Sequence, residues 1–333
     1  MTPTRVLIAG DHFVTPELVR DALAARVGTD LAVTTLTLPW PYTPFGPVAE
    51  VDEASGDEQT LIDALPGIEV AVTQMAPFTE RVFDAAKALR LVVVCRGGPV
   101  NVNLAAAERH GVAVRTTPGR NAVAAAEHTV ALLLAALRQL PDVHAELRAG
   151  AWRSDRYALS QAGTELAGAT VGLVGYGAIG RRVGRILRAF GAEILVYDPY
   201  ADPATLDGAE PVELPELLAR STVVSLHARL TEQTRGMIGA AELARLPAGA
   251  VLVNTARGGL LDYDAVADAL QAGQLGAAAF DVFDTEPLPP GSRLLAAPRV
   301  VLTPHLAGAT RQTAQRAASL AAEEVARHLA RVG

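Results

Sequence analysis

The stretch "VGLVGYGAIGRRVGRIL" constrains the fold more than any other part of the chain. Gly175, Gly177 and Gly180 follow a strand-like run and open a helix-like one. Glycines at this spacing allow a tight turn, close approach of the backbone to a pyrophosphate, and close helix–strand packing. The next strand-like run, "EILVYD", ends in Asp198, whose carboxylate could accept the hydroxyls of an adenosine ribose and would repel a 2′-phosphate. These residues predict a dinucleotide-binding unit that prefers NAD to NADP.

Strand-like and helix-like runs alternate on both sides of this motif. "RVLIAG", "VAVTQ" and "LRLVVVC" precede it, and "TVVSLHA", "AVLVNTA" and "GAAAFDVF" follow it. Such alternation predicts an α/β protein with two doubly wound, parallel-sheet, Rossmann-like domains. Because the glycine motif lies midway along the chain, we expect the second domain to bind the dinucleotide. The first domain is then expected to bind substrate across a cleft, with long helices linking the two.

The composition narrows the class of protein. Half of the 333 residues are hydrophobic, which suits two domains. The net charge is −7 and no Lys/Arg tract is present, which argues against nucleic acid or an anionic membrane as partner. A single cysteine, Cys95, precludes an intramolecular disulfide, and no apolar run approaches the roughly 20 residues of a membrane span. We therefore expect a cytoplasmic protein; the absence of HExxH and CxxC spacings predicts no metal.

Three polar groups lie at predicted strand ends in the second half: Arg257 in "NTARGG", Glu286 in "DVFDTEP" and His305 in "TPHLAG". Ligands of open α/β sheets bind at such strand ends. A histidine suits proton transfer to or from an alcohol, a neighbouring carboxylate raises its pKa and fixes its tautomer, and an arginine fork matches a substrate carboxylate. Taken singly, Arg257 could cap a helix, Glu286 could serve its turn, and His305 could be structural.

The motifs "GYGAIG", "NTARGG", "DVFDTEP" and "TPHLAG", in this order and spacing, resemble the D-isomer-specific 2-hydroxyacid dehydrogenases, which include phosphoglycerate and glycerate dehydrogenases. The resemblance implies that Arg257 clamps the substrate carboxylate, His305 is the acid/base and Glu286 is its partner. It implies that Asp281 orients the nicotinamide carboxamide, and that His227 lies at the cofactor. The full set of expected NAD contacts is Gly175, Gly177, Ala178, Ile179, Gly180, Asp198, His227, Thr231, Thr255, Ala256, Arg257, Asp281 and His305.

The same resemblance implies a discontinuous substrate-binding (catalytic) domain, residues 1–119 with 305–333, and an NAD-binding domain, residues 120–304. The long helix expected over residues 121–140 is rich in alanine and leucine beyond what one buried stripe needs. A second apolar face of this kind suggests that the helix packs across a subunit or domain boundary. The resemblance implies a homodimer formed through this helix.

The chain departs from the family where the substrate loop is expected. The usual Gly-Val-Gly-x-Asp-Asn-Ile-Asp reads "RGGPVNVN", which starts at Arg96, and Arg229 replaces a proline in "HARLT". The expected substrate contacts are Met75, Arg96, Gly97, Gly98, Arg257 and His305. The additional arginines suggest a substrate with a second anionic group. Alternatively, Arg96 pairs with a protein carboxylate, or Arg229 contacts the cofactor phosphates.

The expected function is NAD-dependent interconversion of a D-2-hydroxy acid and a 2-oxo acid by hydride transfer. Two alternatives remain open at this stage. One is a phosphonate or phosphite dehydrogenase on the same scaffold, which the additional arginines allow. The other is an NAD(H)-sensing protein like the transcriptional corepressors that share this fold.

Overall fold

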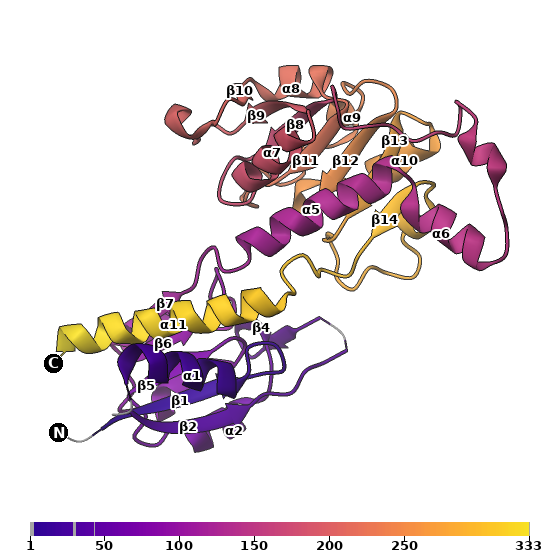
Figure 1. The fold of residues 1–333 in the computed structure, drawn as a ribbon. Helices are drawn as coiled ribbons and strands as arrows, with labels where there is room; N and C mark the ends of the chain where they lie inside the picture. Colours follow the sequence, from indigo (N-terminus) through magenta and orange to yellow (C-terminus); the bar gives the residue numbers. More distant parts are fainter. Residues whose placement is uncertain (1–2, 29–30, 43, 333) are drawn as a thin grey trace. The chain divides into compact units, whose positions relative to one another are not determined.

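A computed structural model describes residues 3–28, 31–42 and 44–332. The chain forms two compact units: unit 1 comprises Met1–Asn121 and Ala309–Gly333, and unit 2 comprises Ala122–Gly308. Both chain ends therefore belong to unit 1 (Figure 1). The predicted domain boundaries follow residues 119 and 304, so the prediction assigns His305 to the first domain. In the structure His305 belongs to unit 2, where its backbone N–H donates to the carbonyl of Asp281 at 2.9 Å.

Unit 1 contains a parallel five-stranded sheet with helices on both faces. Helices α1 and α11 share one apolar cluster with the sheet, and α2, α3 and α4 share the other. A short antiparallel pair, β3 with β4, accompanies the sheet. In sheet order the strands are β2 (Leu31–Thr37), β1 (Thr4–Gly10), β5 (Val70–Thr73), β6 (Leu91–Val94) and β7 (Ala113–Thr116), and the other elements are α1 (Pro16–Val27), β3 (Gly46–Val48), β4 (Val51–Ala54), α2 (Glu58–Ala64), α3 (Glu80–Ala85), α4 (Leu104–Arg109) and α11 (Arg311–Val332).

The first strand explains why so apolar a sequence forms this layered arrangement. Successive side chains of a strand point to opposite faces. Val6 and Ile8 belong to the cluster under α1 and α11, whereas Leu7 and Ala9 belong to the cluster under α2, α3 and α4. All four side chains are fully buried. A continuous apolar run is therefore required, as is usual for a parallel sheet covered on both faces.

Unit 2 contains a parallel seven-stranded sheet, again with helices on both faces. Helices α5 and α7 share one apolar cluster with the sheet, and α8, α9 and α10 share the other. In sheet order the strands are β10 (Glu210–Pro211), β9 (Glu193–Tyr197), β8 (Thr170–Val174), β11 (Val223–Leu226), β12 (Ala250–Asn254), β13 (Leu275–Phe280) and β14 (Val300–Leu302), and the main helices are α5 (Ala122–Leu137), α6 (Leu140–Arg148), α7 (Gly180–Ala189), α8 (Leu214–Arg220), α9 (Ala240–Leu243) and α10 (Tyr263–Gln271).

The order of these strands places the glycine motif where a dinucleotide-binding fold requires it. The order reverses on the two sides of β8: the chain first adds β9 and β10 on one side and then β11 to β14 on the other. Ligands of doubly wound sheets bind at the carboxyl end of the strands beside such a reversal. The turn between β8 and α7 carries Gly175, Gly177 and Gly180. The predicted fold class, two doubly wound parallel-sheet domains, is confirmed.

The long helix is shorter than predicted. Helix α5 ends at Leu137, because Gln139 adopts a left-handed backbone conformation (φ 51°) and Pro141 lies in the first turn of α6. Ten of its 16 residues are buried, against α7 and strands β12, β13 and β14 of the same unit. The alanine and leucine density is therefore accounted for by packing within unit 2, and it does not by itself require a partner.

Among the described residues, no single helix is long and apolar enough to cross a membrane. The bent pair α5 and α6 passes the same test by length and composition alone, with an angle of 65° between the two helices.

Candidate active site

The glycine turn of unit 2 is shaped as the motif predicts. Gly175 has φ +95°, and a Cβ atom on it would lie 2.6 Å from the backbone nitrogen of Ala228. A Cβ on Gly180 would lie 2.3 Å from the carbonyl oxygen of Gly175. Both glycines are therefore required by the protein's own packing. A Cβ on Gly177, in contrast, would meet no atom within 4 Å, so this backbone is open to a ligand.

Asp198 lies directly after β9 and is tied to the glycine turn. Its carboxylate accepts one hydrogen bond from the backbone N–H of Tyr176 at 2.7 Å and another from Tyr200 at 2.9 Å. Each carboxylate oxygen can accept more than one hydrogen bond, so both remain able to bind ribose hydroxyls. The open turn at Gly177 and this positioned carboxylate fit the adenosine diphosphate half of NAD.

The other predicted cofactor contacts fall on three loops that follow β8, β11 and β12. Ala178 and Ile179 complete the glycine turn, while Ala256 follows Asn254 at the end of β12. The hydroxyl of Thr255 is buried 2.6 Å from that of Thr129 on α5. Thr231 lies in an exposed turn closed by Thr234.

His227, directly after β11, is held in its neutral form. Burial lowers its pKa to about 4. Its Nε2 atom lies 3.0 Å from the hydroxyl of Ser225. A neutral imidazole beside the glycine turn adds no charge there, and it is unsuited to serve as a proton donor near pH 7.

Glu286 and His305 are in direct contact, although 19 positions separate them in sequence. The Nδ1 atom of His305 lies 2.8 Å from Glu286 Oε2, and Glu286 Oε1 accepts the backbone N–H of Phe283 at 3.0 Å. One oxygen of the Glu286 carboxylate is therefore held by the Phe283–Glu286 turn, while the other orients the imidazole of His305. The side chain of His305 is 51% exposed, and its Nε2 atom has no hydrogen-bond partner in the described part of the chain. This arrangement leaves one ring nitrogen free to exchange a proton with a ligand.

The pKa shifts of the pair follow from the same contact. The hydrogen bond to Glu286 raises the pKa of His305 and outweighs partial burial, while the positive charge of Arg257 opposes it weakly. Burial would raise the pKa of Glu286, but the hydrogen bond and charge of His305, with the N–H of Phe283, lower it overall. His305 is thus protonated up to a higher pH than an isolated histidine, and Glu286 stays ionised.

Asp281 holds the loop that carries His305. It is completely buried, and its carboxylate accepts the backbone N–H groups of Leu306 and Ala307, each at 2.8 Å, and the hydroxyl of Thr303 at 2.6 Å. His305 lies within this loop with a left-handed backbone (φ 54°), which is unfavourable for a residue other than glycine. His128 on α5 lies 3.1 Å from the Thr303 hydroxyl. The buried carboxylate therefore offsets an unfavourable backbone conformation at His305.

Replacing Asp281 by alanine should destabilise the protein. The buried N–H of Ala307, the partly buried N–H of Leu306 and the hydroxyl of Thr303 would lose their acceptor, at about 1–3 kcal/mol for each group that stays unsatisfied. Burial would raise the pKa of Asp281, but His128, Thr303 and the two N–H groups lower it overall, so its contribution is present above the unfolded pKa and is lost as the pH falls through the folded value. Urea unfolding at pH 7 and below pH 4 measures both effects. A stability gap between wild type and Asp281→Ala that does not shrink in acid would contradict this assignment.

Arg257 follows β12 and comes close to the Glu286 segment through a glycine. Its guanidinium is exposed and contacts its own chain at the carbonyl of Ala256, at 2.6 Å. A Cβ on Gly258 would lie 1.9 Å from the backbone of Phe283, so only glycine allows these two segments to touch. Arg257 is therefore available to bind a ligand in the unit that contains His305.

The predicted substrate residues of unit 1 lie on the loops that follow β5 and β6. Arg96 donates to Glu53 Oε2 at 2.8 Å and to the sulfur of Met75 at 2.9 Å. Met75 is fully buried, so it supports Arg96 and presents no surface of its own. Gly97 and Gly98 lie in an open loop after β6. The pairing with Glu53 corresponds to the alternative in which Arg96 meets a protein carboxylate.

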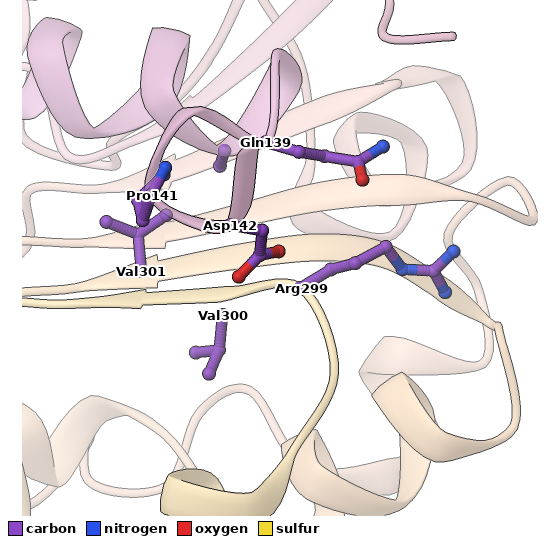
Figure 2. Close-up of a pocket in the computed structure, with 7 residues that line it drawn as sticks. Gln139, Pro141, Asp142, Arg299, Val300 and Val301 are labelled. Carbon is purple, nitrogen blue, oxygen red and sulfur yellow. The ribbon is translucent and has the colours of Figure 1, made fainter. Parts of the chain in front are cut away.

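One small hollow of unit 2 lies elsewhere, between the α5–α6 turn and β14 (Figure 2). Its lining residues are Ala136, Gln139, Pro141, Asp142, Arg299, Val300 and Val301. None of these is a predicted site residue. Within the described ranges, no group of three or more His, Cys, Asp or Glu side chains is placed to hold a metal ion.

Comparison with known proteins identifies the family. Residues 130–307 match the family model described as "D-isomer specific 2-hydroxyacid dehydrogenase, NAD binding domain". The D-3-phosphoglycerate dehydrogenase of Mycobacterium tuberculosis is 40% identical over 285 residues, which cover 84% of this chain and 53% of that protein. The glyoxylate reductase of Korarchaeum cryptofilum is 37% identical over 277 residues, covering 82% of this chain and 83% of that protein.

A solved structure gives the same result. The pyruvate reductase of Chlamydomonas reinhardtii superposes with a TM-score of 0.77 at 30% identity, covering 99% of this chain and 97% of that one. The chain belongs to the D-isomer specific 2-hydroxyacid dehydrogenase family, and unit 2 is its NAD-binding domain. The chain spans about half the length of the phosphoglycerate dehydrogenases that it matches.

Proposed function

We propose that this chain is an NAD-dependent dehydrogenase that interconverts a D-2-hydroxy acid and the corresponding 2-oxo acid. The observation that carries the proposal is the Glu286–His305 pair in the NAD-binding unit. The Glu286 carboxylate is fixed 2.8 Å from His305 Nδ1, while Nε2 has no hydrogen-bond partner among the described residues. The relatives named above act on different small 2-oxo or 2-hydroxy acids, which supports the reaction class but leaves the individual substrate open.

In the direction of reduction, each side chain has a distinct task. Bound NADH supplies the hydride for the 2-carbon. Protonated His305 donates its Nε2 proton to the carbonyl oxygen, and Glu286 stabilises the charged imidazole until that transfer. Arg257 holds the substrate carboxylate through its planar fork. In the direction of oxidation, neutral His305 takes the hydroxyl proton.

The proposal is tested by absorbance at 340 nm with NADH and a panel of 2-oxo acids. The panel contains glyoxylate, pyruvate, hydroxypyruvate, 2-oxoglutarate and 3-phosphohydroxypyruvate, with NADPH as the matched cofactor control. Oxidation of NADH by at least one of these acids is expected, with the D- rather than the L-2-hydroxy acid as product for every acid whose product is chiral. A protein that binds NADH but reduces none of them, or that oxidises only phosphite, would overturn the proposal.

The glycine turn yields a matched pair of variants. Gly177→Ala should leave the thermal unfolding temperature unchanged, because the added Cβ meets no protein atom within 4 Å. It should weaken NADH binding by about tenfold or more, since the methyl group would stand where the pyrophosphate approaches the backbone. Gly180→Ala should instead lower the unfolding temperature, because its Cβ would clash with Gly175. NADH fluorescence titration and differential scanning fluorimetry separate the two; unchanged NADH affinity in Gly177→Ala would remove this turn from the cofactor site.

Glu286→Gln should shift the pH dependence of reduction. A raised pKa keeps His305 protonated to higher pH, so kcat/KM for the 2-oxo acid falls as the pH rises through that pKa. Without the carboxylate this fall should occur at lower pH, because the largest contribution to the raised pKa is the Glu286 hydrogen bond. The measurement is a kcat/KM profile from pH 5 to 10. A profile that keeps its midpoint while its amplitude drops would mean that Glu286 does not set the pKa of His305.

We also infer a cytoplasmic homodimer. Exposed apolar side chains follow α5, on α6 and the segment after it: Leu140, Leu147, Trp152, Tyr157 and Leu159, each more than half exposed. Figure 1 shows this segment reaching out beyond the end of α5. Several exposed large apolar side chains within 20 positions are more than a monomer usually leaves to solvent, and such side chains are typical of protein interfaces. Sedimentation velocity measures the mass, and a monomer at micromolar concentration would refute the dimer.

A further inference from the structure

The loop that carries Arg257 is held by one buried amide of unit 2. Asn254, the last residue of β12, accepts the backbone N–H of Ala256 through Oδ1 at 3.0 Å, and its Nδ2 donates to the carbonyl of Arg257 at 2.9 Å. Asn254 is completely buried. Its side chain therefore fixes the backbone from Ala256 to Arg257, and with it the direction in which the Arg257 side chain leaves the loop.

Tyr263, the first residue of α10, extends this connection to the segment of Glu286. Its hydroxyl donates to the carbonyl of Val282 at 2.5 Å and accepts a long hydrogen bond from Asn254 Nδ2 at 3.4 Å. Val282 directly precedes Phe283, whose backbone N–H holds Glu286 Oε1. A set of hydrogen bonds thus connects the end of β12 to the turn that holds Glu286.

The hydroxyl of Tyr263 is a fixed and permanent donor. The ring lies edge-on to that of Phe280, with 5.3 Å between ring centroids, and 6.0 Å from that of Phe283. Burial raises the pKa of Tyr263 and outweighs the opposing hydrogen bond from the amide, and the charges of Asp284 and Glu286 raise this pKa further. The hydroxyl therefore keeps its proton over the whole pH range in which a histidine titrates.

We propose that Asn254 and Tyr263 are positioning residues that set the orientation of Arg257 relative to the Glu286–His305 pair. The inference rests on the proposed function for the roles of Arg257 and His305. Neither Asn254 nor Tyr263 is among the site residues predicted from the sequence. Their side-chain contacts join positions 9 and 19 apart, and a buried asparagine or tyrosine is common in structural positions.

Tyr263→Phe tests the network in the enzyme, because it removes the hydroxyl and keeps the ring against Phe280. A less firmly held Arg257 should raise KM for the preferred 2-oxo acid about 3- to 10-fold, the range expected for one hydrogen bond. A less firmly held Glu286 should move the alkaline fall of kcat/KM to lower pH. The hydrogen bond of Glu286 is the largest contribution to the raised pKa of His305 and the charge of Arg257 the smallest, so loosening both lowers that pKa.

Gln274→Leu is the matched control. The Gln274 amide donates to the carbonyls of Leu243 and Leu246, at 3.2 and 2.8 Å, so this variant also removes side-chain hydrogen bonds to the backbone of unit 2. Both variants should lower the unfolding temperature, but only Tyr263→Phe should change KM and the pH midpoint. If Tyr263→Phe loses stability and keeps the KM and midpoint of wild type, Tyr263 is a structural residue and the inference is wrong.

Double variants show whether Tyr263 acts through the two site residues. Added to Arg257→Gln at a pH below the pKa of His305, Tyr263→Phe should lower kcat/KM by less than about twofold, because the side chain that it orients is gone. Added to Glu286→Gln, it should no longer move the midpoint. Full, additive effects of Tyr263→Phe in both backgrounds would overturn the inference.

Isotope-edited NMR of the histidine side chains separates this inference from the proposed function, because it needs no substrate. The His305 signal is assigned by its absence in His305→Asn, and its pKa is measured in wild type, Glu286→Gln and Tyr263→Phe. A pKa of His305 that Tyr263→Phe lowers, by less than Glu286→Gln does, supports the inference even if no 2-oxo acid is reduced. A pKa that Glu286→Gln lowers and Tyr263→Phe leaves unchanged would overturn it, even if 2-oxo acids are reduced.

Discussion

Replacing His305 by asparagine should lower kcat for reduction of the preferred 2-oxo acid by roughly 10²- to 10⁴-fold, the usual contribution of a positioned general acid. Asparagine can still donate a hydrogen bond towards Glu286, but it cannot transfer a proton near pH 7. The substitution also relieves little or no backbone strain, because asparagine tolerates the left-handed conformation found at this position (φ 54°). A loss of activity would therefore report the missing proton rather than a misfolded loop.

The measurement is NADH oxidation at saturating substrate, together with the KM and the NADH dissociation constant. His144→Asn, an exposed histidine on α6, is the matched control and should retain full activity. NADH affinity is expected to change less than about tenfold, since the variant removes a proton donor and leaves the glycine turn intact. Turnover within a few-fold of wild type in His305→Asn would exclude His305 as the acid/base.

The fold was predictable because its signals are local. Gly175 and Gly180 have no room for a side chain, and the continuous apolar run of β1 supplies two buried faces, so neighbouring residues alone encode both features. The end of α5 was less predictable. The helical pattern continues to residue 140, but the left-handed backbone of Gln139 ends the helix at Leu137. A glutamine does not by itself predict a left-handed backbone conformation.

Site residues could be predicted where a polar residue type is unusual for its sequence context. They could not be predicted where the contact joins residues that are far apart in sequence. Glu286 and His305, each placed beside a proline, stood out by sequence, and the structure brings them into contact. Arg96 also stood out, but its contact with Glu53 spans 43 positions and no local spacing reveals it. Asp281 is predicted from sequence to lie at the cofactor, and the structure adds its hydrogen bonds to the loop of His305, about 25 positions away, which no local spacing reveals. Which side chains contact each other and which are buried depends on the tertiary structure, so the sequence alone does not reveal it.

Replacing Arg257 by glutamine should lower kcat/KM for the 2-oxo acid by about 10²- to 10⁴-fold. A guanidinium that holds a carboxylate makes two charge-assisted hydrogen bonds, each worth roughly 1.5–3 kcal/mol. The guanidinium is able to do so, since among the residues that the structure describes its one hydrogen bond is to the carbonyl of Ala256. Arg257→Lys should recover only part of the activity, because an ammonium supplies the charge without the planar pair of donors.

The pH dependence of Arg257→Gln also tests whether Arg257 lies close to His305. Its positive charge lowers the pKa of His305, so Arg257→Gln should move the alkaline fall of kcat/KM to higher pH, opposite to the shift in Glu286→Gln. Arg245→Gln, an exposed arginine of unit 2, should change neither activity nor midpoint. A carboxylate clamp beside His305 therefore predicts a large loss of kcat/KM together with a higher midpoint. A loss without any movement of the midpoint would place Arg257 away from the acid/base, and unchanged kcat/KM would refute the clamp.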